Sequence, residues 1–338
     1  MSASKPSLLI LYCGGTIGMR QDVRTSALQP KLSAEELIEY APYLTKEFNI
    51  RMQTITNLDS TNFQPHHWEE IADAIYREYD NYDGFVVIHG TDTMAYTASA
   101  LSYALGNLGK PVILTGSQVP PDILGTDAVS NLVNACLAAT MDFAEVAIVF
   151  GTDILRGNRS MKISESKRNA FISPVFPELG SIRLQPEITY QSIPRRHGGP
   201  LDFKNAFKGN VVVLKITPGI HPETISAIVD SKIDGLILES FGPGNIPNRE
   251  TNLLPPIKKA RKKDIPVLIS TQCIYGTTRM YLYEVGQSAM DLGVIPTGDM
   301  TPEAAYVKLK WALGQTKDGK EIEKIFAKNI AGEVTIPD

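Results

Sequence analysis

A threonine and an aspartate stand side by side at positions 91 and 92, where a strand and a helix are predicted to meet. Residues 85–88 are apolar, and a glycine followed by small polar residues ends the run. This pattern is typical of a buried parallel strand, and residues 94–105 have the composition of a helix. In open α/β sheets, ligands bind where the carboxyl ends of strands meet helix N-termini. Thr91 and Asp92 are therefore either caps of this helix or groups that act on a ligand.

A second hydroxyl group, that of Thr16, follows the apolar run 7–12 and two glycines. Glycines let the backbone turn tightly or approach a ligand closely. Their spacing matches neither of the common phosphate-binding glycine motifs. Residues 19–31 are polar and lack a clear periodicity, which predicts a loop over the rim of the sheet that could serve as a lid. Thr16 is thus a candidate nucleophile, with a plain tight turn as the alternative.

The third stretch, residues 156–162, follows the apolar run 146–150 and ends at Lys162. One interpretation is a solvated basic loop, as expected for most lysines. The other is that Lys162 reaches the same rim as Thr91 and Asp92. Burial disfavours an ammonium ion, so a neutral Lys162 amine could take a proton from a threonine hydroxyl while Asp92 orients it.

A carboxylate and a hydroxyl at positions 59 and 60 precede another predicted helix. Asp59 or Ser60 could simply cap that helix. At the rim of a sheet they could instead hold the ammonium and carboxylate groups of an amino acid. His89 continues a buried strand, and we expect it to be a core residue whose hydrogen bonds are satisfied. His66 and His67 lack the spacing of metal ligands.

The composition is that of an ordinary globular enzyme. The 338 residues are 43% hydrophobic and 21% charged, with a net charge of −4 and no basic stripe, which gives no reason to expect nucleic acid as a partner. The three cysteines are odd in number and far apart, which fits a reducing compartment. No apolar run has the length of a membrane span, and the N-terminus lacks a secretory signal. We therefore expect a cytoplasmic protein without membrane contact.

Short apolar runs alternate with helical patterns along the chain, which predicts an α/β fold with parallel sheets. The pattern lapses after residue 183 in a stretch rich in Pro, Gly and Arg, and resumes at residue 211. We predict a larger, mostly parallel N-terminal α/β domain at 1–190, a linker at 191–210, and a smaller flavodoxin-like α/β domain at 211–338. The tail from 302 to 331 is helical in pattern.

Taken together, these stretches resemble the bacterial L-asparaginases, most closely the cytoplasmic type I branch. The resemblance covers nearly the whole chain, and its first two motifs are specific only in combination. The matching motifs, in chain order, are Gly14-Gly-Thr-Ile-Gly18, Val87-Ile-His-Gly-Thr-Asp-Thr-Met94, Thr115-Gly-Ser-Gln118, Arg156-Gly-Asn-Arg159 with Lys162, and Gly242-Pro-Gly-Asn245.

The resemblance implies an enzyme that converts L-asparagine and water to L-aspartate and ammonia without a metal or organic cofactor. Minor glutaminase or D-asparaginase activity is compatible with it. Thr16 would form an acyl-enzyme, and a second group, made of Thr91, Asp92 and Lys162, would activate a hydroxyl or the water. Which threonine attacks first stays open.

The resemblance also implies substrate-binding residues and an assembly. The α-amino and α-carboxyl groups of the substrate would be bound by Asp59, Ser60, Thr91 and Asp92. The chain would form homodimers or homotetramers, in which Asn245 helps complete the site of a neighbouring subunit.

Two positions depart from the family pattern. Many relatives carry a lid tyrosine that bonds to the first threonine, but residues 18–30 contain none, so another group or loop closure must orient Thr16. Some type I enzymes bind asparagine at an allosteric site through an arginine, where this chain has Glu239. Its charge would repel the carboxylate of the effector, although Thr271 and Cys273 still match. We expect this form of activation to be absent.

Two other functions are compatible with the sequence. The ammonia-releasing subunit of a tRNA-dependent amidotransferase shares these motifs. It normally carries an extra N-terminal β-domain, whereas here the first motif begins almost at once, which argues against it. An amino-acid sensor that no longer catalyses would have no need of Thr16, Thr91 or Lys162, yet all three are present.

Overall fold

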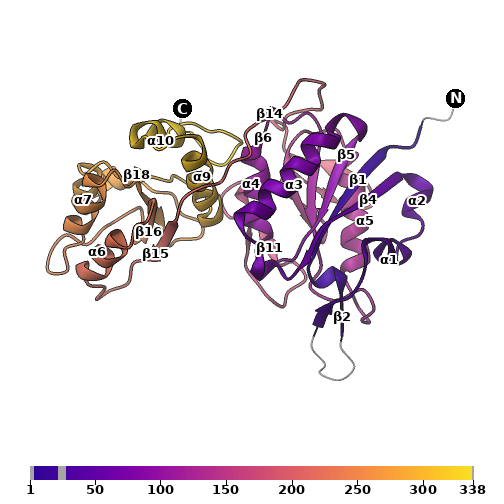
Figure 1. Ribbon diagram of the computed structural model, residues 1–338, viewed down its shortest axis with the longest axis horizontal. Coiled ribbons are helices and arrows are strands. Elements are labelled where there is room, and N and C mark those ends of the chain that lie inside the picture. Colours follow the sequence, from indigo (N-terminus) through magenta and orange to yellow (C-terminus); the bar gives the residue numbers. More distant parts are fainter. Residues whose placement is uncertain (1–3, 22–27, 337–338) are drawn as a thin grey trace. The chain divides into compact units, whose positions relative to one another are not determined.

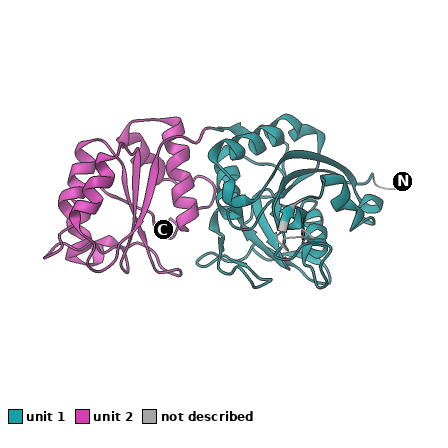
Figure 2. Cartoon of the chain, turned by 60° about the horizontal axis from the view of Figure 1, so that its bottom comes forward, with its two compact units in different colours: residues 1–205 teal, residues 206–338 magenta. Residues whose placement is uncertain are grey.

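The computed structural model describes residues 4–21 and 28–336. The chain divides into two compact units, Met1–Asn205 and Ala206–Asp338 (Figure 2). Each unit is an α/β structure with helices packed around a sheet that contains parallel strands, which confirms the predicted fold class (Figure 1). Among the described residues, no helix combines the length and the apolar character needed to cross a membrane.

The sheet of the first unit has eight strands, five of which are parallel to one another. The remaining three, β9, β12 and β13, extend the sheet in antiparallel pairs at one side. From edge to edge the order is β13 (Pro186–Ile188), β12 (Gly180–Ile182), β9 (Asp153–Arg156), β8 (Val146–Phe150), β7 (Val112–Thr115), β5 (Gly84–Ile88), β1 (Ser7–Gly14) and β4 (Asn49–Leu58). All five parallel strands end at one rim of the sheet.

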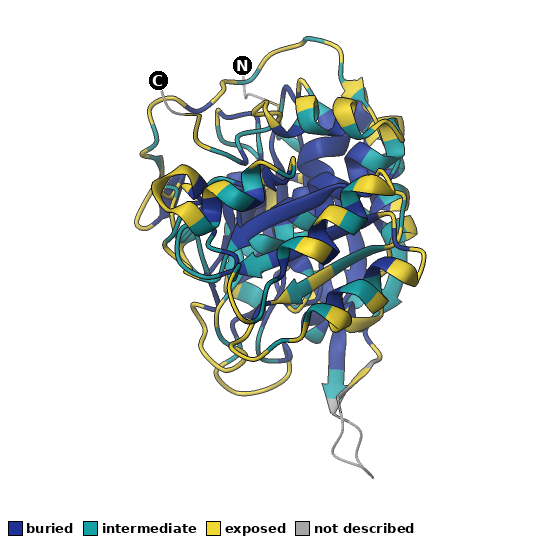
Figure 3. Cartoon of the chain, turned by 90° about the vertical axis from the view of Figure 1, so that its left-hand side faces the viewer, coloured by how far each residue is buried: buried dark blue, intermediate teal, exposed yellow. Residues whose placement is uncertain are grey.

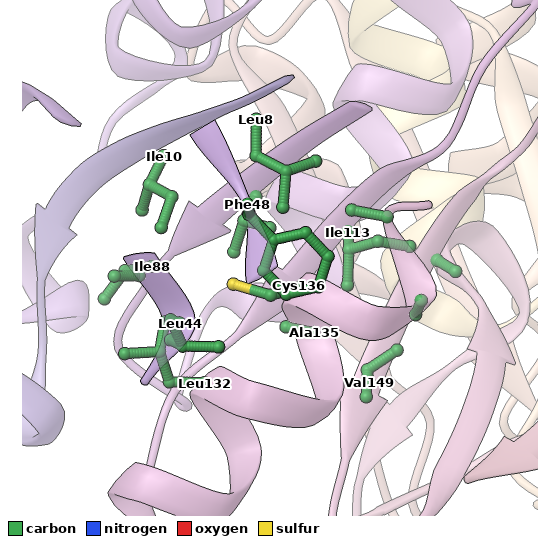
Figure 4. Close-up of a cluster of buried hydrophobic side chains, with 14 of the residues drawn as sticks. Leu8, Ile10, Leu44, Phe48, Ile88, Ile113, Leu132, Ala135, Cys136 and Val149 are labelled. Carbon is green, nitrogen blue, oxygen red and sulfur yellow. The ribbon is translucent and has the colours of Figure 1, made fainter. Parts of the chain in front are cut away.

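The parallel strands other than β4 are apolar because both faces of this part of the sheet are covered. On β1, Leu8 and Ile10 pack with Leu132 and Cys136 from α5 (Ala128–Ala138), a cluster drawn in Figure 4. Leu9, whose side chain must point to the opposite face, is fully buried as well. Figure 3 shows most of the inner strands as buried and the outer surfaces of the helices as exposed, whereas β4 and β15 carry only intermediate and exposed residues.

Among the described residues, the remaining elements of the first unit are four further helices, four 3₁₀ turns and several short strand pairs. Its other helices are α1 (Ala34–Glu39), α2 (Leu44–Glu47), α3 (Pro65–Glu78) and α4 (Met94–Ala104). Its 3₁₀ turns are η1 (Thr16–Gly18), η2 (Ser60–Asn62), η3 (Tyr79–Asn81) and η4 (Gly157–Arg159). Three antiparallel pairs lie outside the main sheet: β2 (Met19–Gln21) with β3 (Leu28–Pro30), β10 (Met161–Lys162) with β11 (Phe171–Ile172), and β6 (Leu105–Gly106) with β14 (Asp202–Phe203).

The second unit has four parallel strands in chain order, with helices on both faces. Leu236 and Leu238 of β16 pack toward α6 and α7, whereas Ile237 packs toward α9 and α10, as strand alternation requires. The strands are β15 (Val211–Lys215), β16 (Gly235–Ser240), β17 (Val267–Thr271) and β18 (Ile295–Pro296). The helices are α6 (Pro222–Asp230), α7 (Leu254–Lys262), α8 (Glu284–Met290), α9 (Pro302–Gln315) and α10 (Gly319–Phe326), with the turn η5 (Met280–Leu282) before α8.

Three segments differ from what the sequence pattern indicates. The expected lid loop contains an antiparallel pair, β2 with β3, and residues 22–27 lie outside the described residues. The helical tail is two helices, because Thr316 is extended and Asp318 caps a new helix at Lys320 N. Residues 191–205, expected in a linker, belong to the first unit, where Arg196 donates to backbone carbonyls of Asp83, Ala139 and Met141.

A fully buried ion pair fastens the end of the chain to α9. Lys308 Nζ lies 2.5 Å from Glu333 Oε1 and donates to the carbonyl of Lys328 at 2.7 Å. The Glu333 carboxylate also accepts from the backbone N–H groups of Ile330 and Ala331. Burial lowers the pKa of Lys308, although Glu333 opposes that shift. Removing one partner would leave a buried charge without its counter-charge.

We expect Glu333→Gln to lower the free energy of unfolding of the second unit by about 3–5 kcal/mol, the usual cost of breaking a buried pair. Urea unfolding followed by the fluorescence of Trp311, which lies on α9, measures this. Glu321→Gln removes the partner of Lys324 in an exposed pair and serves as the matched control, for which we expect no measurable change. Equal stability of the two variants would contradict the assigned role of the buried pair.

Candidate active site

Three backbone segments meet at the rim of the first sheet because glycines allow close contact. Gly15 has φ +88°, and a Cβ there would lie 2.4 Å from the Cα of Gly90. A Cβ on Gly14 would lie 2.6 Å from backbone atoms of Leu58, and one on Gly90 would lie 2.6 Å from Ser60 Oγ. No larger residue fits these contacts without moving the backbone. The ends of β1, β4 and β5 are thereby brought into direct contact.

This contact places the two candidate threonines on adjoining segments. Thr16 begins the turn η1 directly after Gly15, and Thr91 follows Gly90. The strand pair after η1 is anchored by Tyr12, whose hydroxyl donates to Leu32 O at 3.0 Å. Gly18 packs on that hydroxyl so tightly that a Cβ would lie 1.8 Å from it. Burial raises the pKa of Tyr12 to about 12, so it remains a neutral donor.

Lys162 reaches the rim and contacts both Thr91 and Asp92. Its Nζ lies 2.7 Å from Thr91 Oγ1 and 2.5 Å from Asp92 Oδ1. Thr91 is buried, and the side chain of Lys162 is 17% exposed against 52% for Asp92. The short strand β10 presents Lys162 by pairing with β11. Lys162, Thr91 and Asp92 thus lie together at the rim, as the sequence predicted. Solvent reaches this cluster from the Asp92 side.

The capping interpretation of Thr91 and Asp92 is wrong. The residue at the N-cap of α4 is Thr93, and it makes no side-chain capping bond. Its hydroxyl donates instead to the carbonyl of Ser60 at 2.8 Å, which ties the β5 end to the β4 end. Thr91 and Asp92 are therefore available for contacts at the rim.

Asp59 and Ser60 lie at this junction, and neither caps α3, whose N-cap is Gln64; Asp59 instead caps the short turn η2. Its carboxylate accepts from the backbone N–H and the hydroxyl of Thr61, both at 2.9 Å, at the start of η2. Asp59 is exposed, and Ser60 is buried against Gly90. Their contact with the β5 end puts both residues next to the Thr91 segment, where a small ligand would meet them.

The basic stretch before Lys162 is not a solvated loop. Arg156 and Arg159 are both buried. Arg156 forms an ion pair with Glu145 at 2.5 Å, and its guanidinium group lies 4.2 Å from the centre of the Phe176 ring. Gly157 packs against Ala98 of α4, so the turn η4 is fixed to the body of the unit. This packing gives the backbone before Lys162 a rigid support.

Gln118 is a further rim residue in contact with Thr91, and it was not predicted to have a role of its own. Thr91 Oγ1 donates to Gln118 Oε1 at 3.3 Å. Gln118 follows the end of β7 within the Thr115-Gly-Ser-Gln motif, which was the only signal that pointed to it. In the described part of the chain, no three His, Cys, Asp or Glu side chains gather as metal ligands would.

Asn245 lies in the second unit, in the turn after β16. Its backbone N–H donates to Phe241 O at 2.8 Å, and its side-chain oxygen is buried with no hydrogen-bond partner among the residues that the structure describes. Glu239 lies near the end of β16, and Thr271 Oγ1 donates to Gly242 O at 2.6 Å. The expected lack of allosteric activation through Glu239 stays a prediction.

The fold and the Thr–Lys–Asp cluster define an α/β protein with a hydrolase-type site in which the candidate base is a lysine. Comparisons with known proteins identify the family. The family model described as "Asparaginase, N-terminal" matches residues 7–194, and the "Glutaminase/Asparaginase C-terminal domain" matches residues 210–326. The chain belongs to the asparaginase family.

Two kinds of relative are similar to the chain over its whole length. An L-asparaginase of Thermococcus kodakarensis is 40% identical over 97% of this chain and 99% of that protein. A glutamyl-tRNA(Gln) amidotransferase subunit of Pyrococcus abyssi is 36% identical over 98% of this chain and 77% of that protein. Family membership therefore leaves two activities to be weighed.

Solved structures agree with the fold. The thermostable L-asparaginase from Thermococcus kodakarensis has a TM-score of 0.92 at 39% identity, and L-asparaginase I from Vibrio cholerae has a TM-score of 0.86 at 34% identity. Each similarity covers 98% of this chain and 100% of the solved chain. The two-unit architecture is thus shared with L-asparaginases along the entire sequence.

His89 lies beneath the site as a fully buried, neutral side chain, as expected for a core histidine. Its Nδ1 lies 2.7 Å from Gly90 O, and its Nε2 lies 2.9 Å from the hydroxyl of Thr97. Burial lowers the pKa of His89 to about 4. In the unfolded chain a histidine has a pKa of about 6.5. Between about pH 6.5 and about pH 4, His89 is therefore protonated in the unfolded chain but neutral in the folded one.

We predict that the first unit loses about 2 kcal/mol of stability between pH 7 and pH 5 through His89, since protonation favours the unfolded state there. His89→Gln should lower the overall stability but remove this part of the pH dependence. The exposed His221→Gln serves as control and should retain it. Urea unfolding at the two pH values measures the difference, and an NMR titration midpoint for His89 near 6.5 would contradict the prediction.

Proposed function

We propose that this chain is an amidohydrolase that converts L-asparagine and water to L-aspartate and ammonia. The observation that carries the proposal is the contact of Lys162 with Thr91 and Asp92, on a rim where Thr91 and Thr16 follow touching glycines. Hydrolysis of an unactivated amide needs a nucleophile, a proton acceptor and a fixed geometry, and this cluster supplies residue types for each.

In the proposed reaction, Thr16 Oγ1 adds to the carboxamide carbon of the substrate and the hydroxyl proton passes to the cluster. The neutral Lys162 amine accepts that proton, and Asp92 holds the resulting ammonium. Collapse of the tetrahedral intermediate breaks the C–N bond, and the departing nitrogen takes up the proton and leaves as ammonia. Water then attacks the acyl-enzyme with the same cluster as base, which releases L-aspartate and restores Thr16. The atoms and protons balance in the same way if Thr91 Oγ1 makes the first attack in place of Thr16 Oγ1.

Substrate binding is assigned to the junction of the β4 and β5 ends. We propose that Asp59 binds the α-amino group and that Ser60, with Thr91 and Asp92, completes the site. Asp59 is suited to this role because it is exposed and its orientation is fixed by two bonds from Thr61. No metal or organic cofactor is part of the proposal.

A second candidate is the ammonia-releasing subunit of a tRNA-dependent amidotransferase. It is favoured by the amidotransferase relatives, which are 36–37% identical to the chain. The chain spans 77% of the Pyrococcus abyssi relative, whereas it spans 99% of the Thermococcus kodakarensis L-asparaginase. The greater identity favours the free-standing amidohydrolase, and the same residues of this chain would serve either activity.

We predict that the purified chain alone releases ammonia from L-asparagine, and less from L-glutamine and D-asparagine. Thr91→Val should abolish release, and Lys162→Met should lower kcat by at least about 100-fold, the usual value of a general base. Lys204→Met removes a comparable exposed pair with Asp202 and should leave kcat unchanged. If the folded chain binds aspartate but releases no ammonia, the sensor hypothesis holds. Release that needs an added partner protein and charged tRNA would indicate the amidotransferase.

We further propose that the chain forms homodimers or homotetramers and that Asn245 acts on substrate bound to a neighbouring copy. The side-chain oxygen of Asn245 is buried and has no hydrogen-bond partner among the described residues, which supports a ligand contact.

We predict that Thr91→Val and Asn245→Ala are each impaired alone but complement each other when co-expressed. A mixed dimer has one site with both changes and one with neither, so random assembly returns up to about a quarter of the wild-type kcat. Ammonia release by the mixture, compared with each variant alone, measures this. The absence of recovery in confirmed mixed oligomers would place Asn245 outside the neighbouring site.

A further inference from the structure

Gln118 is held at the rim of the first sheet by a rigid backbone. Its N–H donates to both carboxylate oxygens of Asp127, at 3.1 and 3.0 Å. Asn131 in turn donates to Asp127 at 3.1 Å and to the carbonyl of Gly116 at 2.9 Å. Asp127 and Asn131 are both buried, so these bonds are protected from competition with water. The Cα of Gln118 therefore has a fixed position relative to β7.

The side-chain amide of Gln118 has a single orientation that satisfies its neighbours. Its Nε2 donates to the carbonyls of Ser164 and Lys167, each at 3.2 Å. A flipped amide would point Oε1 at these two carbonyl oxygens, which cannot donate. Since both amide hydrogens are used, Oε1 faces Thr91 as a pure acceptor. The hydroxyl hydrogen of Thr91 must then point toward Gln118.

The two carbonyls that Gln118 binds belong to the segment that carries Lys162. Ser164 and Lys167 lie in the connection between β10 and β11. A second bond across the same gap runs from Arg168 Nη2 to Gly125 O at 2.5 Å. Gln118 is therefore bonded at one end to Thr91 and at the other to the hairpin of Lys162. Its side chain thus links the two residues whose Lys162 Nζ and Thr91 Oγ1 atoms lie 2.7 Å apart.

We infer that Gln118 is a positioning residue that sets the distance and the hydrogen-bond direction between Thr91 and Lys162. With its hydrogen directed to Gln118, the Thr91 oxygen presents its lone pairs to Lys162 and accepts from the ammonium. When Lys162 is neutral, the hydroxyl must turn from Gln118 to Lys162 before a proton can move. The 3.3 Å bond is long, so this rotation costs little. The inference deepens the proposed function and rests on it.

The test is Gln118→Met, which keeps the length of the side chain and removes all three of its side-chain hydrogen bonds. We expect kcat for ammonia release to fall about 10- to 100-fold, because small displacements of catalytic groups carry penalties of that order. We expect KM to stay within about twofold, because Gln118 is not among the residues assigned to substrate binding.

The matched control is Gln272→Met. Gln272 Nε2 also donates to two backbone carbonyls, those of Ile216 and Glu239, but it lies in the second unit and has no part in the proposed site. Its loss should lower the Tm about as much as that of Gln118 while kcat is retained. A KM rise with constant kcat in Gln118→Met, or equal kcat losses in the two variants, would overturn the positioning role.

A crystal structure of Gln118→Met tests the positioning role without any measurement of activity. Separation of Lys162 Nζ from Thr91 Oγ1 beyond about 3.5 Å, the limit of a hydrogen bond, supports the inference. Retention of the 2.7 Å contact overturns it. If the wild type releases no ammonia, the proposed function fails, and the crystal structure alone still decides whether Gln118 sets this distance.

Discussion

The contact between the backbones of Gly15 and Gly90 is the constraint on which the arrangement of the site depends. Adjacent parallel strands lie about 4.8 Å apart, but the side chains that follow them normally keep the connecting loops farther away. Here both loops lack a Cβ at the point of contact, so Thr16 and Thr91 start from segments that touch. The Ser60 carbonyl accepts a hydrogen bond from the hydroxyl of Thr93, which brings the β4 end into the same junction. The three strand ends therefore meet at one junction, which is where the proposed substrate site lies.

Much of this arrangement could be predicted from the sequence because it follows from strand ends. Fully buried parallel strands leave a strong apolar signal, and polar residues directly after them must lie at one rim. This logic placed Thr16, Thr91 and Asp92 correctly at the ends of β1 and β5. It failed for β4, an edge strand whose residues are all intermediate or exposed, since such a strand has no apolar run to find. Asp59 and Ser60 were found only because they precede a helix.

The residues that the sequence did not reveal act through contacts between segments distant in the chain. Arg156 and Arg159 resemble a solvated loop by composition, but their burial depends on Glu145 and on the Phe176 ring. Gln118 lies 27 positions from Thr91 and 46 from Ser164, and no local pattern encodes those bonds. Only the folded connection between β10 and β11 gives Gln118 its two carbonyl partners. Residue types therefore indicated the candidate reacting groups, whereas the groups proposed to orient them required the structure.

Two lysine–carboxylate pairs in this chain show how burial decides what an ion pair can do. Lys308 and Glu333 are completely buried, and backbone groups of Lys328, Ile330 and Ala331 bond to them, so this pair is closed off from water. Lys162 and Asp92 have the same separation, but Asp92 is half exposed and the other partner of Lys162 is the Thr91 hydroxyl. Water can reach this pair from the Asp92 side, and the hydroxyl of Thr91 lies next to its lysine. The same chemical pair thus fastens the chain end in one unit and, in the proposed reaction, moves protons in the other.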